Sequence, residues 1–455
     1  MEENAIFDER FCREKFPGAC TVVIFGATGD LAARKLFPAL QTLFHTKLLH
    51  PASRIVAASR RQINANSLAP EIRNDAEFLQ LVKFHSFSPD DPFSAKEFAA
   101  FLDRMDNSTA PLPRLYYLAL PSPAYPDQIN AMAQVGMFLE PDKKLFRNLV
   151  LEKPLGYDFS AMKKVRRVLK NHLEEHQIYL IDHYLGKDEV QNILLLRFAN
   201  AIFSGVWNRK YIESITIGVC ERDGIGSRAG YFDRAGIVRD MFQSHLLLML
   251  GLCMMRRPKE FSSSAINRSL ANALSYVSAE KILYSGQYQS YRQEKNVPAH
   301  SNTITCADIL FKSSRCDWKG VAFRLYAGKK MAFDRTFIKV LFKREASDFF
   351  GRELSFNLPG NELALEIKPS PGISLALCSK KAGPHLCLGT LTLKYKAEHP
   401  GDGYSRLLLD CLNCDRTFFP DFKLQTITGK ICDKLLDAPE DNVVFYPDGT
   451  IPDNL

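Results

Sequence analysis

A short stretch of the sequence, LIDHYLGKDE at 180–189, gathers side chains that could carry chemistry. Asp182 and His183 follow an apolar run, and Tyr184 and Lys187 come directly after them. A carboxylate beside a histidine suits proton transfer, because it orients the imidazole and stabilises its charged form. A histidine, a phenol and a lysine can together hold an anion through charge-assisted hydrogen bonds. We therefore expect this stretch to contribute to a catalytic or binding site.

A second polar group ends another apolar run. The run NLVLEKP at 148–154 finishes with Glu152, Lys153 and Pro154. If both runs are parallel strands of one sheet, their carboxyl ends meet at the edge where such sheets bind ligands. Each group alone could be a surface loop, but together they predict a site at that edge.

The elements needed to build this sheet can be found along the first part of the chain. Apolar, β-branched or aromatic runs predict strands, and helical patterns such as 159–176 lie between them. The predicted strands are 20–26, 54–59, 114–120, 148–154 and 178–184. Strands that alternate with helices indicate an α/β Rossmann-like, doubly wound parallel sheet, here over residues 1–182.

A glycine turn follows the first predicted strand and opens the first helix. It reads GATGDL and contains Gly26, Thr28, Gly29, Asp30 and Leu31. Gly26 permits a tight turn, and Gly29 lets backbone N–H groups approach a pyrophosphate at the helix N-terminus. The motif is not the full GxGxxG, and any strand–turn–helix can use two glycines.

The end of the second strand favours the nucleotide interpretation. A site for NAD usually has an acid there to bind the ribose 2′-hydroxyl, but this chain has Ser59, Arg60 and Arg61. A guanidinium can pair with a 2′-phosphate through a bidentate fork. The alternative is a pair of solvated surface arginines. We predict NADP as the coenzyme.

Beyond residue 182 the pattern changes to that of an α+β domain, which we assign to 183–455. Helical patterns at 188–203 and 228–257 flank a strand pattern at 211–220. Short strands separated by turns then follow over 303–345 and 353–396, which is typical of a mostly antiparallel sheet.

One histidine in this second domain could also carry chemistry. His245 lies in an apolar helical segment, where a lone histidine is usually a satisfied core residue. Here Arg239, Asp240 and Gln243 are close by, and a purely structural helix has little reason to place so many polar groups beside the run LLLML. We therefore expect this segment to face a ligand.

Composition narrows the class of protein. The chain has 455 residues, of which 46% are hydrophobic, and a net charge of +8. The basic residues are spread out, so a phosphorylated metabolite is a better expected partner than nucleic acid. The 11 cysteines lack disulfide or zinc spacing, so no metal is expected. The N-terminus has no apolar signal core, and the longest uncharged stretch, 241–255, is too short to span a membrane, which indicates a cytoplasmic protein.

At this point several motifs, in order and over nearly the whole chain, resemble those of the glucose-6-phosphate dehydrogenase family. They are GATGDLA (26–32), EKPLG (152–156), DHYLGKD (182–188), GYFDRAGIVRDMFQSHLL (230–247) and AGKKM (327–331). The resemblance implies NADP-dependent oxidation of glucose 6-phosphate at C1 to a lactone, the first step of the oxidative pentose phosphate pathway. It also implies a homo-oligomer, dimer or tetramer, formed through the large sheet.

The resemblance assigns a role to each candidate residue. His245 would be the general base, oriented by Asp182, and Lys153 would lie between substrate and coenzyme. The sugar phosphate would be held by His183, Tyr184 and Lys187. Sugar hydroxyls would bind Glu221 and Asp240, with Lys329 as a further cation. The coenzyme would contact Gly26, Thr28, Gly29, Asp30, Leu31 and Arg60.

The chain also departs from the family pattern. Asp188 stands for the usual Glu of DHYLGKE, Ser244 replaces an Asn, and Asp334 stands where a second cation is common. The tail 421–455 lacks the family's acidic, Trp-containing segment, so we do not expect the second, structural NADP site that some members have. Two alternatives stay open: an NADP-linked oxidoreductase of another aldose, and a non-catalytic NADP-sensing protein of the same fold.

Overall fold

The structure is a computed structural model. It describes residues 15–452 apart from 107–109 in part, 143, 157–158, 345–359, 386, 398–402 and 437–442. The N-terminal residues on which the absence of a signal core was judged lie outside this range, as does the start of the predicted strand region 353–396.

The first half of the chain forms a six-stranded sheet in the order β3-β2-β1-β4-β5-β6, with every neighbouring pair parallel. Its strands are β1 (Thr21–Phe25), β2 (Arg54–Ser59), β3 (Val82–Ser86), β4 (Arg114–Leu118), β5 (Arg147–Leu151) and β6 (Ile178–Leu180). The order and direction confirm the Rossmann-like, doubly wound prediction. β3 was not predicted, because this edge strand is only partly buried and reads VKFHS, with no apolar run.

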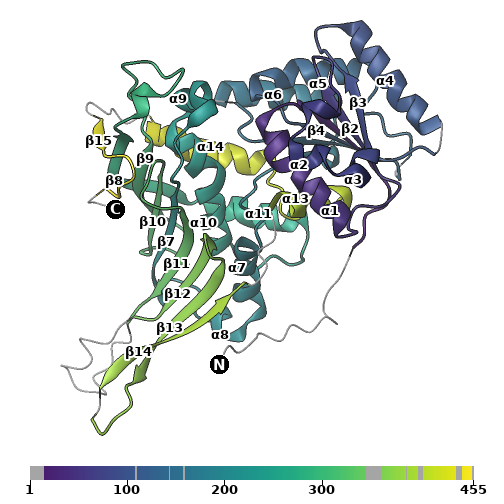
Figure 1. Cartoon of the computed structure of the whole chain (residues 1–455). Coiled ribbons are helices and arrows are strands. Elements are labelled where there is room, and N and C mark those ends of the chain that lie inside the picture. Colours follow the sequence, from purple (N-terminus) through teal and green to yellow (C-terminus); the bar gives the residue numbers. More distant parts are fainter. Residues whose placement is uncertain are drawn as a thin grey trace.

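Helices cover both faces of this sheet (Figure 1). They are α1 (Phe37–His45), α2 (Pro70–Arg73), α3 (Ala76–Gln80), α4 (Pro92–Asn107), α5 (Tyr125–Gln134) and α6 (Phe159–His172). The π-helical segment Ala32–Leu36 leads into α1.

The second sheet has nine strands in the order β14-β13-β12-β11-β7-β10-β9-β8-β15. They are β7 (Ile212–Cys220), β8 (Val277–Tyr288), β9 (Cys306–Ser313), β10 (Ala322–Gly328), β11 (Arg335–Phe342), β12 (Glu362–Lys368), β13 (Gly372–Lys380), β14 (Leu388–Lys396) and β15 (Val444–Tyr446). The prediction of a mostly antiparallel sheet is confirmed, although β7–β10 and β8–β15 pair in parallel.

Two predicted helices of the second half are interrupted. The pattern at 188–203 forms α7 (Asp188–Ala199) and α8 (Ala201–Ser204), because Asn200 between them is extended. The pattern at 228–257 forms α9 (Ala229–Ile237), the π-helical segment η7 (Val238–Leu246) and α10 (Leu247–Met254). Gly236, with φ of 62° and ψ of 175°, breaks the helical path before η7.

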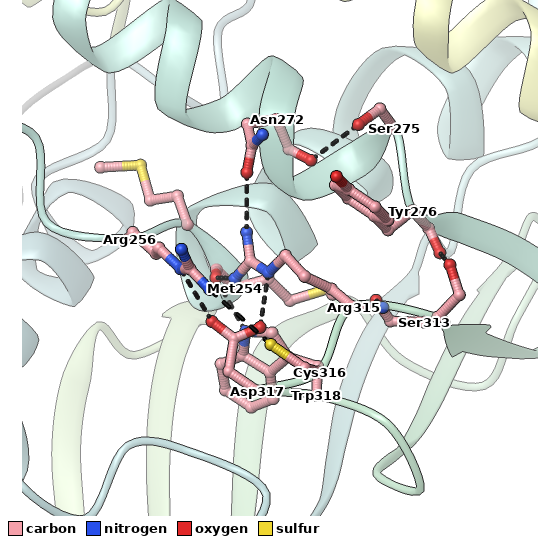
Figure 2. Close-up of polar contacts among 12 residues, drawn as sticks. Met254, Arg256, Asn272, Ser275, Tyr276, Ser313, Arg315, Cys316, Asp317 and Trp318 are labelled. Carbon is pink, nitrogen blue, oxygen red and sulfur yellow. Dashed lines mark hydrogen bonds and ion pairs between the residues drawn. The ribbon is translucent and has the colours of Figure 1, made fainter.

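The end of α10 lies inside the protein, so its last carbonyls need partners other than water. The indoles of Trp207 and Trp318 donate to the carbonyls of Cys253 and Met254, at 2.8 and 2.9 Å. Arg315 also donates to Met254 and pairs with Asp317, as Figure 2 shows. The helix that continues from His245 is therefore fixed at its far end.

The stretch Ala229–Met254 is, among the described residues, the one helix long and apolar enough to cross a membrane by length and composition. It is longer than the stretch considered from the sequence, because α9 and η7 join α10. However, 89% of its most apolar window is buried inside the protein, as expected for a core helix.

The remaining helices are α11 (Ser263–Leu274), α13 (Gly403–Leu412) and α14 (Phe422–Leu436). α13 comes from the C-terminal part of the chain but returns to the first sheet. Leu407, Leu408 and Cys411 share a core with Leu40 of α1 and Val22 of β1. This helix therefore joins the two halves and brings C-terminal residues to the first sheet's edge.

Candidate active site

Asp182 and His245, predicted from opposite halves of the chain, meet in the structure. Asp182 follows β6 and its side chain is fully buried, while His245 lies on η7. The imidazole Nδ1 is 2.9 Å from Asp182 Oδ1, and the backbone N–H of Tyr184 donates to the same oxygen at 3.0 Å. A carboxylate that accepts from Nδ1–H leaves Nε2 as the basic nitrogen of the ring.

Lys153 completes this centre. It follows β5, and its Nζ lies 3.2 Å from Asp182 Oδ2 and 3.4 Å from the carbonyl oxygen of Ser244. Burial alone would raise the pKa of Asp182, but the neighbouring His245 and Lys153 hold it below its ordinary value. Asp182 is therefore ionised and available to stabilise an imidazolium.

The polar residues that follow β5 and β6 lie at the same edge of the first sheet, as predicted. β1, β4, β5 and β6 are parallel neighbours, so Gly26, Ala119, Glu152 and Asp182 lie just beyond adjacent carboxyl ends. The site thus occupies the edge where doubly wound sheets bind their ligands.

Two of the proposed phosphate-binding residues lie beside His245, and the third lies beside one of these two. The rings of His183 and Tyr184 have centroids 4.7 and 4.5 Å from that of His245, and Lys187 Nζ lies 4.9 Å from the centre of the Tyr184 ring. Burial, with a smaller effect from His245, lowers the pKa of His183 well below its ordinary value. A bound dianion would oppose this shift by favouring the charged imidazole.

The second group of predicted substrate residues is linked by Lys329. Its Nζ lies 2.7 Å from Glu221 Oε2 and 3.0 Å from Asp240 Oδ2, and the residue is almost fully buried. Burial would lower the pKa of Lys329, but the two carboxylates raise it. Asp240 and His245 are both on η7, where π-helical bonding places residues five apart near one another.

The glycine turn has the geometry expected of a coenzyme cradle. Gly26 has φ of +83°, and a Cβ there would lie 2.4 Å from the carbonyl oxygen of Ala119. The backbone N–H groups of Gly26 and Ala27 donate to Ala58 O on β2, at 3.0 and 3.1 Å. Arg60, two residues beyond Ala58, is exposed beside this turn.

The other turn residues are at the surface. Thr28 and Asp30 are exposed, and Leu31 and Gly29 are half-buried. Asp30 pairs with Arg34 at 2.7 Å, one helical turn further on. The outer side of the turn therefore presents polar groups to solvent.

Asp334, where the sequence departs from the family pattern, accepts from the backbone N–H of Arg222 at 3.1 Å and pairs with Lys368. The following Arg335 pairs with Glu366 on β12. Neither side chain contacts the residues around His245 among the interactions of the described chain. Among the residues that the structure describes, no group of three or more His, Cys, Asp or Glu side chains is arranged to hold a metal ion.

Sequence reasoning missed Tyr404 and gave Glu152 no role. Tyr404, at the start of α13, stacks on the His183 ring with centroids 6.1 Å apart and planes at 9°. The partly buried Glu152 carboxylate accepts hydrogen bonds from Tyr117 and Tyr404. Tyr404 is more than 200 positions from the motif it contacts, and no local pattern marks it, so only the fold reveals this contact.

Glu152 makes the stability of the site depend on pH. Burial raises its pKa from 4.5 to about 7. A folded-state pKa above the unfolded value means that folding favours the protonated acid, so this residue costs stability as pH rises from about 4.5 to about 7. Glu152→Gln should remove the cost, so its melting temperature relative to wild type should increase between pH 5 and pH 8, by the equivalent of on the order of 1–3 kcal/mol. Thermal unfolding at several pH values measures this.

The matched control for that experiment is Glu97→Gln, which changes an exposed carboxylate on α4. It should give the same small difference from wild type at every pH. A Glu152→Gln difference that is constant across the range would contradict the assignment.

Comparisons with known proteins match both domains of the chain to the same family. Residues 23–192 match the family described as "Glucose-6-phosphate dehydrogenase, NAD binding domain", and residues 194–453 match its C-terminal domain. A "Glucose-6-phosphate 1-dehydrogenase" of Chlamydia muridarum is 32% identical over 88% of this chain and 86% of its own. A cytoplasmic relative of that name from Arabidopsis thaliana is 33% identical over 92% of this chain and 86% of its own.

Solved structures give the same result. A glucose-6-phosphate dehydrogenase in complex with its substrate glucose 6-phosphate superposes with a TM-score of 0.86 and 28% identity, covering 97% of both chains. The enzyme from Mycobacterium avium gives a TM-score of 0.81 and 27% identity over 95% of both chains. The chain belongs to the glucose-6-phosphate dehydrogenase family.

Proposed function

We propose that this protein oxidises glucose 6-phosphate at C1 to 6-phosphogluconolactone, with NADP as the oxidant. The observation that carries the proposal is the buried Asp182–His245 pair, 2.9 Å apart and joined to Lys153 at the edge of the coenzyme-binding sheet. The membership of the family over both domains supports the substrate and the coenzyme.

His245 acts as the general base through Nε2. A C1 hydroxyl is a weak acid, so loss of hydride from C1 requires removal of its proton in the same step. Asp182 keeps Nδ1 protonated and, from its fully buried position, stabilises the imidazolium. NADP, when bound, supplies the nicotinamide that accepts the hydride.

The substrate is held at two places around this base. His183, Tyr184 and Lys187 bind the phosphate, whose binding energy then holds C1 in a reactive position. Glu221 and Asp240 accept hydrogen bonds from sugar hydroxyls, and Lys329 keeps both carboxylates in place. Lys153 lies between the substrate and the coenzyme.

The coenzyme site is formed by the glycine turn. Gly26, Thr28, Gly29, Asp30 and Leu31 line it, and the close approach of the Gly26 backbone to Ala119 leaves no room for a side chain. Arg60 binds the 2′-phosphate and so selects NADP over NAD.

We propose that the protein is a homo-oligomer and is cytoplasmic. β14, which projects at the end of the large sheet (Figure 1), exposes Leu391, Leu393 and Tyr395. These residues alternate along the strand and so face one side, as an interface would require.

Three plant relatives carry the word cytoplasmic in their names. Analytical ultracentrifugation that finds only a monomer, or imaging that finds the protein in an organelle, would contradict these two points.

We also propose a domain boundary between residues 182 and 183. Ile181 belongs to a core of the first sheet and Tyr184 to the core of the second, and α13 crosses back to the first. Limited proteolysis that cuts first within either sheet would argue against this division.

Replacing the proposed base should abolish most turnover. His245→Asn keeps a polar side chain of similar size but cannot take the proton, so kcat should fall by about 10²-fold or more. Affinity for glucose 6-phosphate and NADP, measured by calorimetry, should change little. Turnover is followed by the absorbance of reduced nicotinamide.

The wild-type assay decides among the alternatives left open by the sequence. Turnover of glucose 6-phosphate but not of glucose supports the proposal. Equal turnover of free sugars would favour another aldose substrate, and NADP binding without turnover of any sugar phosphate would favour the sensing role.

Arg60→Ala should weaken NADP binding selectively. Loss of a charge-assisted contact to the 2′-phosphate should raise the KM for NADP by about 10- to 100-fold, while any activity with NAD stays unchanged. Arg61→Ala is the matched control, because it removes the neighbouring exposed charge and should have the smaller effect. If the two variants behave in the opposite way, the 2′-phosphate contact belongs to Arg61.

A further inference from the structure

We propose that the C-terminal strand β15 belongs to the sugar-phosphate site, where Tyr446 acts as a positioning residue for Lys329. This inference rests on the proposed function, and it assigns a role to the tail, which the sequence motifs left without one.

β15 is the edge strand of the large sheet and lies beside β8 (Figure 1). It pairs in parallel with β8 through Val444, Phe445 and Tyr446. The N–H of Gln289 donates to Tyr446 O at 3.0 Å, and the N–H of Ser290 donates to Asp448 Oδ1 at 3.1 Å. The tail is thus bound along its length and not only at one point.

From this anchor the Tyr446 side chain reaches the substrate-site lysine. Its hydroxyl donates to Lys329 O at 2.7 Å and lies 2.9 Å from Thr305 Oγ1. The N–H of Lys329 donates to Thr305 O at 3.0 Å. Tyr446 and Lys329 are 2% and 1% exposed, so water cannot replace these bonds. Both backbone polar groups of Lys329 are therefore held, one of them by the tail.

The tail also binds the residues that follow Lys329. Gly449 N–H donates to Lys330 O at 2.8 Å, and Met331 and Thr450 form a parallel bridge. Lys330 has φ of +54°, a conformation that a residue with a side chain adopts only when its surroundings impose it. The contacts from the tail provide such surroundings.

The same turn fixes Glu221. The N–H of Glu221 donates to Gly328 O, and the N–H of Met331 donates to Glu221 O, both at 2.9 Å. Tyr446 therefore supports the backbone from which both Lys329 and its partner Glu221 extend. A shift of this turn would move the groups that bind the sugar, whereas the glycine turn of the coenzyme site lies on the other sheet.

The test compares Tyr446→Phe with wild type in the full-length protein. The variant keeps the ring and removes the hydroxyl, so Lys329 O loses its partner. We expect the Kd and KM for glucose 6-phosphate to rise by roughly 10-fold, with kcat within about 3-fold and the KM for NADP unchanged. Binding is measured by calorimetry and turnover by reduced nicotinamide absorbance.

The matched control is Tyr284→Phe, which changes another buried tyrosine on the neighbouring β8. In the described chain its hydroxyl makes no hydrogen bond to residues 328–331, so both substrates should bind as in wild type. Asp448→Ala is a second variant at an exposed position that loosens the anchor at Ser290. It should shift glucose 6-phosphate affinity in the same direction as Tyr446→Phe but by less.

The results separate this inference from the proposed function. If wild type binds glucose 6-phosphate without oxidising it, the function fails, but weaker binding by Tyr446→Phe still supports the tail's role. Unchanged glucose 6-phosphate affinity in a folded Tyr446→Phe would overturn the inference. An equal loss for both substrates together with a lower melting temperature would also overturn it, because it would show general destabilisation.

Discussion

The site depends on one buried carboxylate that two cationic or ionisable groups share. Asp182 has no exposed surface on its side chain, and its two oxygens contact Lys153 and His245 from different segments. A buried charge without such partners would cost several kcal/mol. Removing either partner would therefore leave the Asp182 charge partly uncompensated. Because β5, β6 and η7 supply these three groups, the electrostatic pairing also fixes the second half of the chain against the first.

The helical segment that carries His245 departs from regular α-helical geometry. Gly236 breaks it, η7 is π-helical, and Trp207, Trp318 and Arg315 satisfy its buried far end. Bonding from residue i to i+5 is uncommon and often marks functional sites. Here it brings the Lys329-bound Asp240 and the Asp182-bound His245 together on one segment.

The sequence was most informative where structure is local. The strands of the first sheet are buried apolar runs, so β1, β2, β4, β5 and β6 and the polar residues at their ends could be predicted. Strands β3, β8 and β15 were missed because they are partly exposed, lie at the edge of a sheet or are very short. The break at Gly236 was missed because its apolar neighbours fit a continuous helix. Tyr404 and Tyr446 contact segments that are distant in the sequence, and no local pattern along the chain predicts such contacts. The roles of Glu221, Asp240 and Lys329 were expected only from the family resemblance.

We propose that Asp182 and His245 work as one unit in removing the substrate proton. The most direct test is a double-mutant cycle in kcat/KM for glucose 6-phosphate, using Asp182→Asn, His245→Asn and the double variant. If Asp182 acts through the imidazole, the double variant should be little slower than His245→Asn alone. If the losses in kcat/KM of the two single variants multiply in the double variant, the two residues contribute independently and do not form one unit.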